Sequence, residues 1–148
     1  MHRKIVPDIV SGQKIELLAE DITVRKAAEY MAERHIGAVM LGKSGKLAGI
    51  FTERDLLTRI VAAGKDPEKT KVGEVMTKDP DTVGPDEEAL TALEKMREKG
   101  YRHLPVAAED KVVGIVSIRD LYAAVKNELE SDLKQREAFI FDTGYGSG

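Results

Sequence analysis

The chain has 148 residues, of which 42% are hydrophobic and 33% are charged, and its formal net charge at pH 7 is −3. This composition is typical of a folded globular chain and excludes an intrinsically disordered one. The absence of cysteine excludes disulfides, thiolate zinc sites and cysteine nucleophiles, and the acidic surplus argues against a nucleic-acid partner.

The amino-terminal residues do not have the pattern of a secretory signal. Pro7 and Asp8 interrupt the apolar stretch near the start, which is too short for a signal core. No segment approaches the about 20 consecutive apolar residues that a bilayer-spanning helix needs. We therefore expect a cytoplasmic protein that does not contact a membrane.

An internal repeat dominates the sequence. Residues 17–60 align with residues 82–125 without a gap, and a quarter of the aligned positions hold identical residues. Unrelated segments of ordinary composition would share far fewer. Because a unit of this size would bury too little of its surface alone, we expect the two copies to share one module.

Each copy shows the same order of elements. A short opening strand is expected at 14–18 and at 81–83, followed by helices whose apolar positions recur at helical spacing. Asp21 and Asp86 precede these helices and suit a cap or first-turn position. Apolar runs at 38–41 and 47–51, and at 103–107 and 112–116, then predict hairpin strands. A second helix follows from about residue 53 and from about residue 118, so each unit reads β-α-β-β-α.

These elements divide the chain into a first repeat (5–64), a linker (65–71), a second repeat (72–126) and a carboxy-terminal extension (127–148). The linker is polar and contains Pro67 and three lysines. The extension has a helical, highly charged pattern to about residue 137, then an apolar cluster at 138–141 and a glycine-rich tip. We expect the apolar cluster to pack on a partner subunit or on the module itself.

The best-preserved part of the repeat is polar. The stretch GIFTERDL, residues 49–56, returns as GIVSIRDL, residues 114–121. Each stretch lies where a strand passes into a helix, so the hydroxyl and the carboxylate three residues later could simply form a capping box. Capping alone does not explain the repeated Gly49 and Gly114 or the repeated arginine, because glycine at a strand end indicates a close approach to the backbone.

A nucleotide site is the alternative interpretation of the same residues. Free N–H groups at a helix amino terminus suit a phosphate, and arginine pairs with phosphate oxygens. A carboxylate can accept the hydroxyls of a ribose, as it does in dinucleotide-binding folds. From the residues alone, capping and nucleotide binding are about equally supported.

The doubled Gly-hydrophobic-x-Thr/Ser-x-x-Asp motif, set in β-α-β-β-α units, resembles a CBS domain pair, or Bateman module. The segments 36–39 and 101–106 are similar to the first core strand of that family, and the resemblance covers about residues 5–126. It implies a mixed α/β (α+β) fold in which two repeats are related by a pseudo-twofold axis. It also implies two clefts between the repeats for adenosine compounds such as AMP, ADP, ATP, NAD or S-adenosylmethionine.

The resemblance also assigns roles to individual residues. The acids of the two motifs would hold ribose hydroxyls, and the hydroxyl residues would contact ribose or phosphate. The opening strands would flank the adenine, and the residues before the second hairpin would face the phosphates. The residues expected to contact the ligand are Leu18, Ile36, Thr52, Arg54, Asp55, Thr82, Val83, Arg102, His103, Pro105, Ser117, Arg119 and Asp120.

The two clefts are not expected to be chemically equal. Arg102 and His103 in the second copy correspond to Gly37 and Ala38 in the first. The cleft with Arg102 and His103 should therefore be the better site for an anion.

The leading hypothesis is a regulatory sensor without catalytic activity that binds an adenosine compound and acts on a separate protein through a conformational change. It needs no cofactor and no metal, because the three histidines lack metal-ligand spacing, and a homodimer is expected. A ligand-free scaffold for assembly is the alternative. A hydrolase built on Ser117, His103 and Asp120 is a third, remote hypothesis, because neither an oxyanion hole nor a nucleophile elbow is visible.

Overall fold

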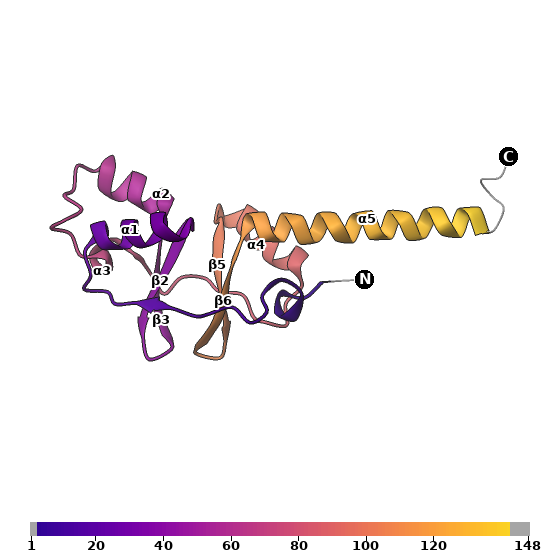
Figure 1. The fold of residues 1–148 in the computed structure, drawn as a ribbon, viewed down its shortest axis with the longest axis horizontal. Coiled ribbons are helices and arrows are strands. Elements are labelled where there is room, and N and C mark those ends of the chain that lie inside the picture. The colour runs from indigo at the N-terminus through magenta and orange to yellow at the C-terminus, as the bar shows by residue number, and fades with distance from the viewer. Residues whose placement is uncertain (1–2, 143–148) are drawn as a thin grey trace.

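The computed structural model describes residues 3–142, with side chains described through residue 137. It shows a mixed α+β fold in which two β-hairpins stand next to each other and most helices of each repeat lie beside the hairpin of that repeat (Figure 1). The predicted glycine-rich tip and the side chains of the predicted apolar cluster at 138–141 lie outside the described residues.

The first repeat follows the predicted order of elements. An amino-terminal turn, η1 (Ile5–Ile9), precedes the opening strand. The last helical turn, α2, continues directly into the π-helical segment η2, so together they form the predicted second helix. The elements are β1 (Leu17–Leu18), α1 (Val24–Arg34), β2 (Ala38–Lys43), β3 (Lys46–Thr52), α2 (Glu53–Asp55) and η2 (Leu56–Val61).

The second repeat begins with two short elements that the sequence did not predict, α3 and β4. Its last helix, α5, continues well past the repeat and projects away from the body of the molecule (Figure 1). The elements are α3 (Val72–Val75), β4 (Thr77–Lys78), α4 (Ala89–Lys99), β5 (His103–Ala108), β6 (Lys111–Ser117) and α5 (Ile118–Asp142).

The repeated sequence gives a repeated strand register. Ala38 pairs with Thr52 in the first hairpin, and the corresponding His103 pairs with Ser117 in the second. Both hairpins contain an irregularity at the same place, and both opening segments pair in parallel with the first hairpin strand. The strand order is β1-β2-β3-β6-β5, and the two hairpins meet through the pair Lys46 and Lys111. The predicted fold is therefore confirmed.

The predicted helix caps are wrong in detail. The residue that caps α1 is Thr23, whose Oγ1 accepts a hydrogen bond from the Lys26 backbone N–H at 3.2 Å. Glu88 occupies the same position before α4 and makes no side-chain cap. Asp21 and Asp86 therefore lie two residues before the capping positions and outside the first turns of the helices.

The buried residues form two clusters, one for each hairpin, and each cluster takes residues from the other repeat's leading segment. Ile5 and Val10, at the start of the chain, are buried in the cluster of the second repeat. Val72 and Val75, which lead into the second repeat, are buried in the cluster of the first. The two repeats therefore exchange their leading segments.

This exchange explains the repeated glycines. A Cβ atom at Gly49 would lie 2.5 Å from Met76 Sδ and 2.8 Å from the Thr77 carbonyl oxygen, and a Cβ at Gly114 would lie 2.6 Å from both Gln13 Oε1 and Val10 Cγ1. The sequence correctly predicted a close approach at both positions. What approaches is the leading segment of the opposite repeat.

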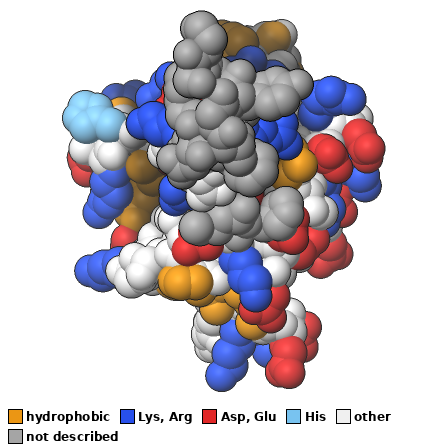
Figure 2. Space-filling view, turned by 90° about the vertical axis from the view of Figure 1, so that its right-hand side faces the viewer, with side chains coloured by type: hydrophobic (Ala, Val, Ile, Leu, Met, Phe, Trp, Pro, Cys, Tyr) orange, Lys and Arg blue, Asp and Glu red, His pale blue; other side chains and the backbone are white. Residues whose placement is uncertain are grey.

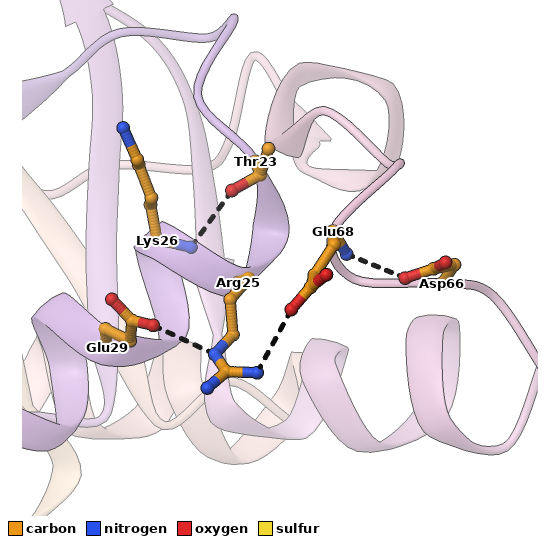
Figure 3. Close-up of polar contacts among 6 residues, drawn as sticks. All are labelled: Thr23, Arg25, Lys26, Glu29, Asp66 and Glu68. Atoms are coloured by element: carbon orange, nitrogen blue, oxygen red, sulfur yellow. Dashed lines mark hydrogen bonds and ion pairs between the residues drawn. The ribbon is translucent and has the colours of Figure 1, made fainter.

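The linker packs on the start of α1. The Arg25 side chain pairs with Glu29 at 2.9 Å and reaches Glu68 of the linker at 3.5 Å, and the Glu68 backbone N–H donates to Asp66 Oδ1 (Figure 3). The Val24 N–H also donates to the Thr70 carbonyl oxygen. These contacts fix the path by which the chain crosses between the repeats.

The surface carries charges of both signs. In the view of Figure 2, lysine and arginine side chains lie among acidic ones around the part of the face that the structure does not describe. Among residues 3–142, no helix is long and apolar enough to cross a membrane.

Candidate functional site

Both repeated polar motifs form capping boxes. Thr52 Oγ1 accepts the Asp55 backbone N–H at 3.2 Å, and Asp55 Oδ2 accepts the Thr52 N–H at 3.0 Å. Ser117 Oγ and Asp120 Oδ2 make the same two contacts at 3.1 and 3.4 Å. The structural role of these residues is therefore real, and it fixes the hydroxyl and carboxylate groups at the mouth of each strand-to-helix junction.

One of these junctions opens into a cavity of about 470 Å³ between the two repeats. The first repeat contributes the end of β3 and the start of the following helix, and the second repeat contributes residues of the segment 77–81 and residues 99–105, which lead into β5. The lining residues are Ile50, Thr52, Glu53, Arg54, Asp55, Leu57, Arg59, Thr77, Pro80, Asp81, Lys99, Gly100, Tyr101, Arg102, His103, Leu104 and Pro105.

Two arginines tie the first repeat to the walls of this cavity. Arg59 Nε lies 3.5 Å from Asp55 Oδ1, and its Nη1 donates to the Val75 carbonyl oxygen at 2.7 Å. Arg54 Nη1 donates to the Gly100 carbonyl oxygen at 3.2 Å, at the carboxy terminus of α4. The bond from Arg54 to Gly100 joins the two repeats at the edge of the cavity. It is favourable because a cation is stabilised at a helix carboxy terminus.

A third set of polar contacts joins three residues of the second repeat, Asp81, Lys99 and Tyr101. Asp81 accepts hydrogen bonds from Tyr101 Oη at 2.8 Å and from Lys99 Nζ at 3.2 Å. These two bonds lower the pKa of Asp81, and the bond to Asp81 raises the pKa of Tyr101. The carboxylate of Asp81 is therefore ionised and locally neutralised near pH 7.

His103 is one of the residues that line the cavity. Burial lowers its pKa below the ordinary value, although the nearby Glu53 and Asp120 act in the opposite direction. A Cβ atom at Gly37 would lie 3.1 Å from Glu53 Oε1 and 3.2 Å from His103 Cε1. Glu53 and His103 therefore occupy the space beside Gly37, and His103 is neutral near pH 7.

The structure brings six of the predicted site residues together and places the others elsewhere. The cavity is lined by Thr52, Arg54, Asp55, Arg102, His103 and Pro105. Ser117, Arg119 and Asp120 lie at the corresponding junction of the second repeat, outside that lining. Leu18 pairs with Leu41 on the first hairpin, and Ile36 is 42% exposed. The Thr82 carbonyl oxygen accepts Lys95 Nζ, and Val83 is buried in the second core.

Several lining residues were not predicted from the sequence. Asp81, Lys99 and Tyr101 come from a loop and a helix end, where local patterns do not indicate which way a side chain points. A weak signal was present for one of them, because Asp81 corresponds to Glu16 in the repeat alignment. Both acids accept a hydrogen bond from a tyrosine, Tyr101 and Tyr30 respectively.

The three residues of the hypothetical hydrolase are Ser117, His103 and Asp120, and two of them cap a helix. The Ser117 hydroxyl accepts the Asp120 backbone N–H, as a cap does, and the cavity is lined by His103 but not by Ser117 or Asp120. Among the described residues, no group of three or more histidine, aspartate or glutamate side chains is placed to hold a metal ion.

Comparison with known proteins identifies both repeats. The family model of the CBS domain matches residues 6–62 and 72–127. A mitochondrial CBS domain-containing protein of Arabidopsis thaliana, CBSX3, is 38% identical over 125 residues, which are 81% of this chain and 61% of that protein. The chain spans less than two thirds of the length of this relative and a smaller share of others, down to 18%.

Solved structures show the same fold. The CBS domain protein PAE2072 from Pyrobaculum aerophilum, complexed with AMP, superposes with a TM-score of 0.67 at 28% identity, covering 78% of this chain and 92% of that one. The CBS domain pair of protein MJ0100, in complex with 5′-methylthioadenosine and S-adenosyl-L-methionine, gives a TM-score of 0.74 at 25% identity, with coverages of 86% and 99%. This chain therefore belongs to the CBS domain family, and its two repeats are a CBS domain pair.

Proposed function

We propose that this CBS pair is a regulatory module that binds an adenosine compound between its repeats and reports the occupancy to a separate protein. The observation that carries this proposal is the cavity of about 470 Å³, in which the Thr52–Asp55 junction of one repeat faces a cationic segment of the other. Its volume is in the range of small-molecule sites.

The proposed pose uses the functional groups that the fold fixes. Asp55 would accept the ribose hydroxyls, because an ionised carboxylate has about four acceptor positions and the capping contact and Arg59 do not use all of them. Thr52 would contact ribose or phosphate. The segment that leads into Thr82 and Val83, which lines the cavity through Pro80 and Asp81, would flank the adenine, and Arg102 would face the phosphate.

The ligands of similar proteins support this choice of compound. The structures of PAE2072 with AMP and of the MJ0100 pair with two adenosine derivatives show that CBS pairs of this fold bind such compounds. Because the cavity is walled by both repeats, a ligand would bind better to one arrangement of the repeats than to another. Such differential binding shifts the population of arrangements and would give the regulatory signal without catalysis.

Isothermal titration of the full chain with AMP, ATP, NAD and S-adenosylmethionine tests the proposal. We expect measurable heat and a rise in the melting temperature with at least one of these compounds, and loss of both with Asp55→Ala. If none of the four gives heat or a thermal shift, the module is not an adenosine sensor.

Assembly is a second candidate function, and the exposed apolar side chains favour it. Val61 and Tyr122, on the second helices of the two repeats, are 67% and 57% exposed. Leu129 and Leu133 on the projecting part of α5 are 59% and 57% exposed. We propose that these helices pair two copies in a homodimer. A ligand-free scaffold would keep this dimer and give no heat with any nucleotide.

A further inference from the structure

The two copies of the repeat differ in charge at corresponding positions. Arg102, which lines the cavity, corresponds in the repeat alignment to Gly37, which has no side chain. Arg59, which also lines the cavity, corresponds to Ala124 on α5. The carboxylate proposed to bind ribose therefore occurs in both copies, as Asp55 and Asp120. The arginines at these two positions occur only once, and both line the cavity.

The charges that line the cavity are not all paired with each other. The cavity has four cationic side chains, Arg54, Arg59, Lys99 and Arg102, and three acidic ones, Glu53, Asp55 and Asp81. Lys99 neutralises Asp81 and Arg59 lies beside Asp55. Arg54 donates only to an uncharged carbonyl, and Arg102 makes no ion pair with any residue between 3 and 137. Two guanidinium groups therefore remain for an anion.

Packing beside Gly37 disfavours a larger side chain there. The imidazole of His103 and the carboxylate of Glu53 lie so close to Gly37 that a Cβ there would be 3.2 and 3.1 Å from them. Contacts this short leave little room for any larger residue. An arginine at this position, which would match Arg102, would therefore require the ends of both side chains to shift by a few tenths of an ångström.

We infer that the module has one phosphate-selective cleft, at Arg54 and Arg102, which takes a phosphorylated adenosine and discriminates against S-adenosylmethionine. This inference rests on the proposed function, because it concerns the same cavity. The physical reason is charge: AMP is an anion, 5′-methylthioadenosine is neutral, and S-adenosylmethionine carries a sulfonium cation. Guanidinium groups bind phosphate through charge-assisted hydrogen bonds.

Isothermal titration of the full chain with these three compounds, at low and at moderate salt, tests the inference. We expect one AMP per chain and an affinity order of AMP, then 5′-methylthioadenosine, then S-adenosylmethionine, with differences that shrink as salt rises. Arg102→Ala should weaken AMP binding by about tenfold or more and leave 5′-methylthioadenosine binding unchanged, and Arg102→Lys should restore part of the loss.

Arg97→Ala is the matched control, because Arg97 is an exposed arginine of α4 that does not line the cavity. Its AMP affinity should equal that of the wild type. S-adenosylmethionine binding as tightly as AMP, two AMP per chain, or an equal loss of both AMP and 5′-methylthioadenosine in Arg102→Ala would overturn the inference. If none of the three compounds binds, the proposed function itself fails.

Discussion

Asp55 combines a structural and a proposed binding role in one carboxylate. Its Oδ2 caps the helix that follows β3, and its Oδ1 faces Arg59. The same residue type at the same place in the second repeat, Asp120, makes the same cap. The capping and nucleotide interpretations of the motif therefore do not exclude each other, and only their consequences for binding separate them.

Replacing Asp55 with alanine should remove both roles. We expect a loss of about 1 kcal/mol in the free energy of unfolding, which is typical for a helix cap, and loss of AMP binding. Asp120→Ala is the control, because it removes the same cap outside the cavity lining. Urea unfolding and titration calorimetry measure the two effects. Equal loss of AMP binding in both variants would contradict the assignment of the site to the cavity.

His103 should make the stability depend on pH. Because burial lowers its pKa in the folded state, the unfolded chain takes up the proton first as the pH falls. Stability is therefore unaffected above the ordinary histidine pKa, about 6.5, and declines below it. Asp81, whose pKa is also lowered, contributes only at much more acidic pH, near and below the ordinary aspartate range.

The measurement is the melting temperature of the wild type and of His103→Asn between pH 7.5 and 5. We expect a steeper decrease for the wild type than for the variant over this interval. Parallel curves would show that His103 is protonated equally well in the folded and unfolded chains.

The repeated elements were predictable from the sequence, and the exchanged ones were not. Helical spacing of apolar residues placed α1 and α4, and apolar runs bounded by turn residues placed the two hairpins, because each of these elements is long enough to show its own pattern. The elements α3 and β4 span four and two residues, too few for any period. Their structure depends on packing against the first repeat, which a local pattern does not contain.

The same distinction applies to the site. Thr52 and Asp55 were placed in it because they belong to the repeated motif, and Arg102 because the segment 101–106 resembles the first core strand of the CBS family. Tyr101 and Lys99 contribute through their bonds to Asp81, and this group of three forms only after α4 and the opening segment have packed together. Sequence therefore predicted the groups attached to regular elements and missed those positioned by tertiary contacts.

The amino-terminal turn should stabilise the second repeat although it precedes the first. Ile5 is fully buried in the second cluster. We expect Ile5→Ala to lower the free energy of unfolding by about 2–5 kcal/mol, as large-to-small changes in a core do. Ile36→Ala, at a position that is 42% exposed, should cost about 0.5 kcal/mol or less. Similar midpoints for both variants in urea would show that the turn is not part of the core.

At the scale of the whole molecule, the exposed apolar side chains of the second helices predict a dimer. The double substitution Val61→Lys and Tyr122→Lys should convert the dimer into a monomer, because it places charges in an interface that must exclude water. Light scattering after size-exclusion chromatography measures the mass. Leu90→Lys is the control, since Leu90 is 46% exposed on α4, outside these helices. A monomeric wild type, or a dimer that survives the double substitution, would rule out this interface.

Because the two repeats exchange their leading segments, neither repeat should fold fully when it is separated from the other. If the chain were cut in the linker, the first fragment would carry Ile5 and Val10, which complete the other fragment's core, and the second would carry Val72 and Val75, which complete the first. Neither fragment contains all the residues that its own hairpin buries. The two fragments should therefore recognise and complement each other, and a single copy moved into another protein would leave behind part of what holds it folded.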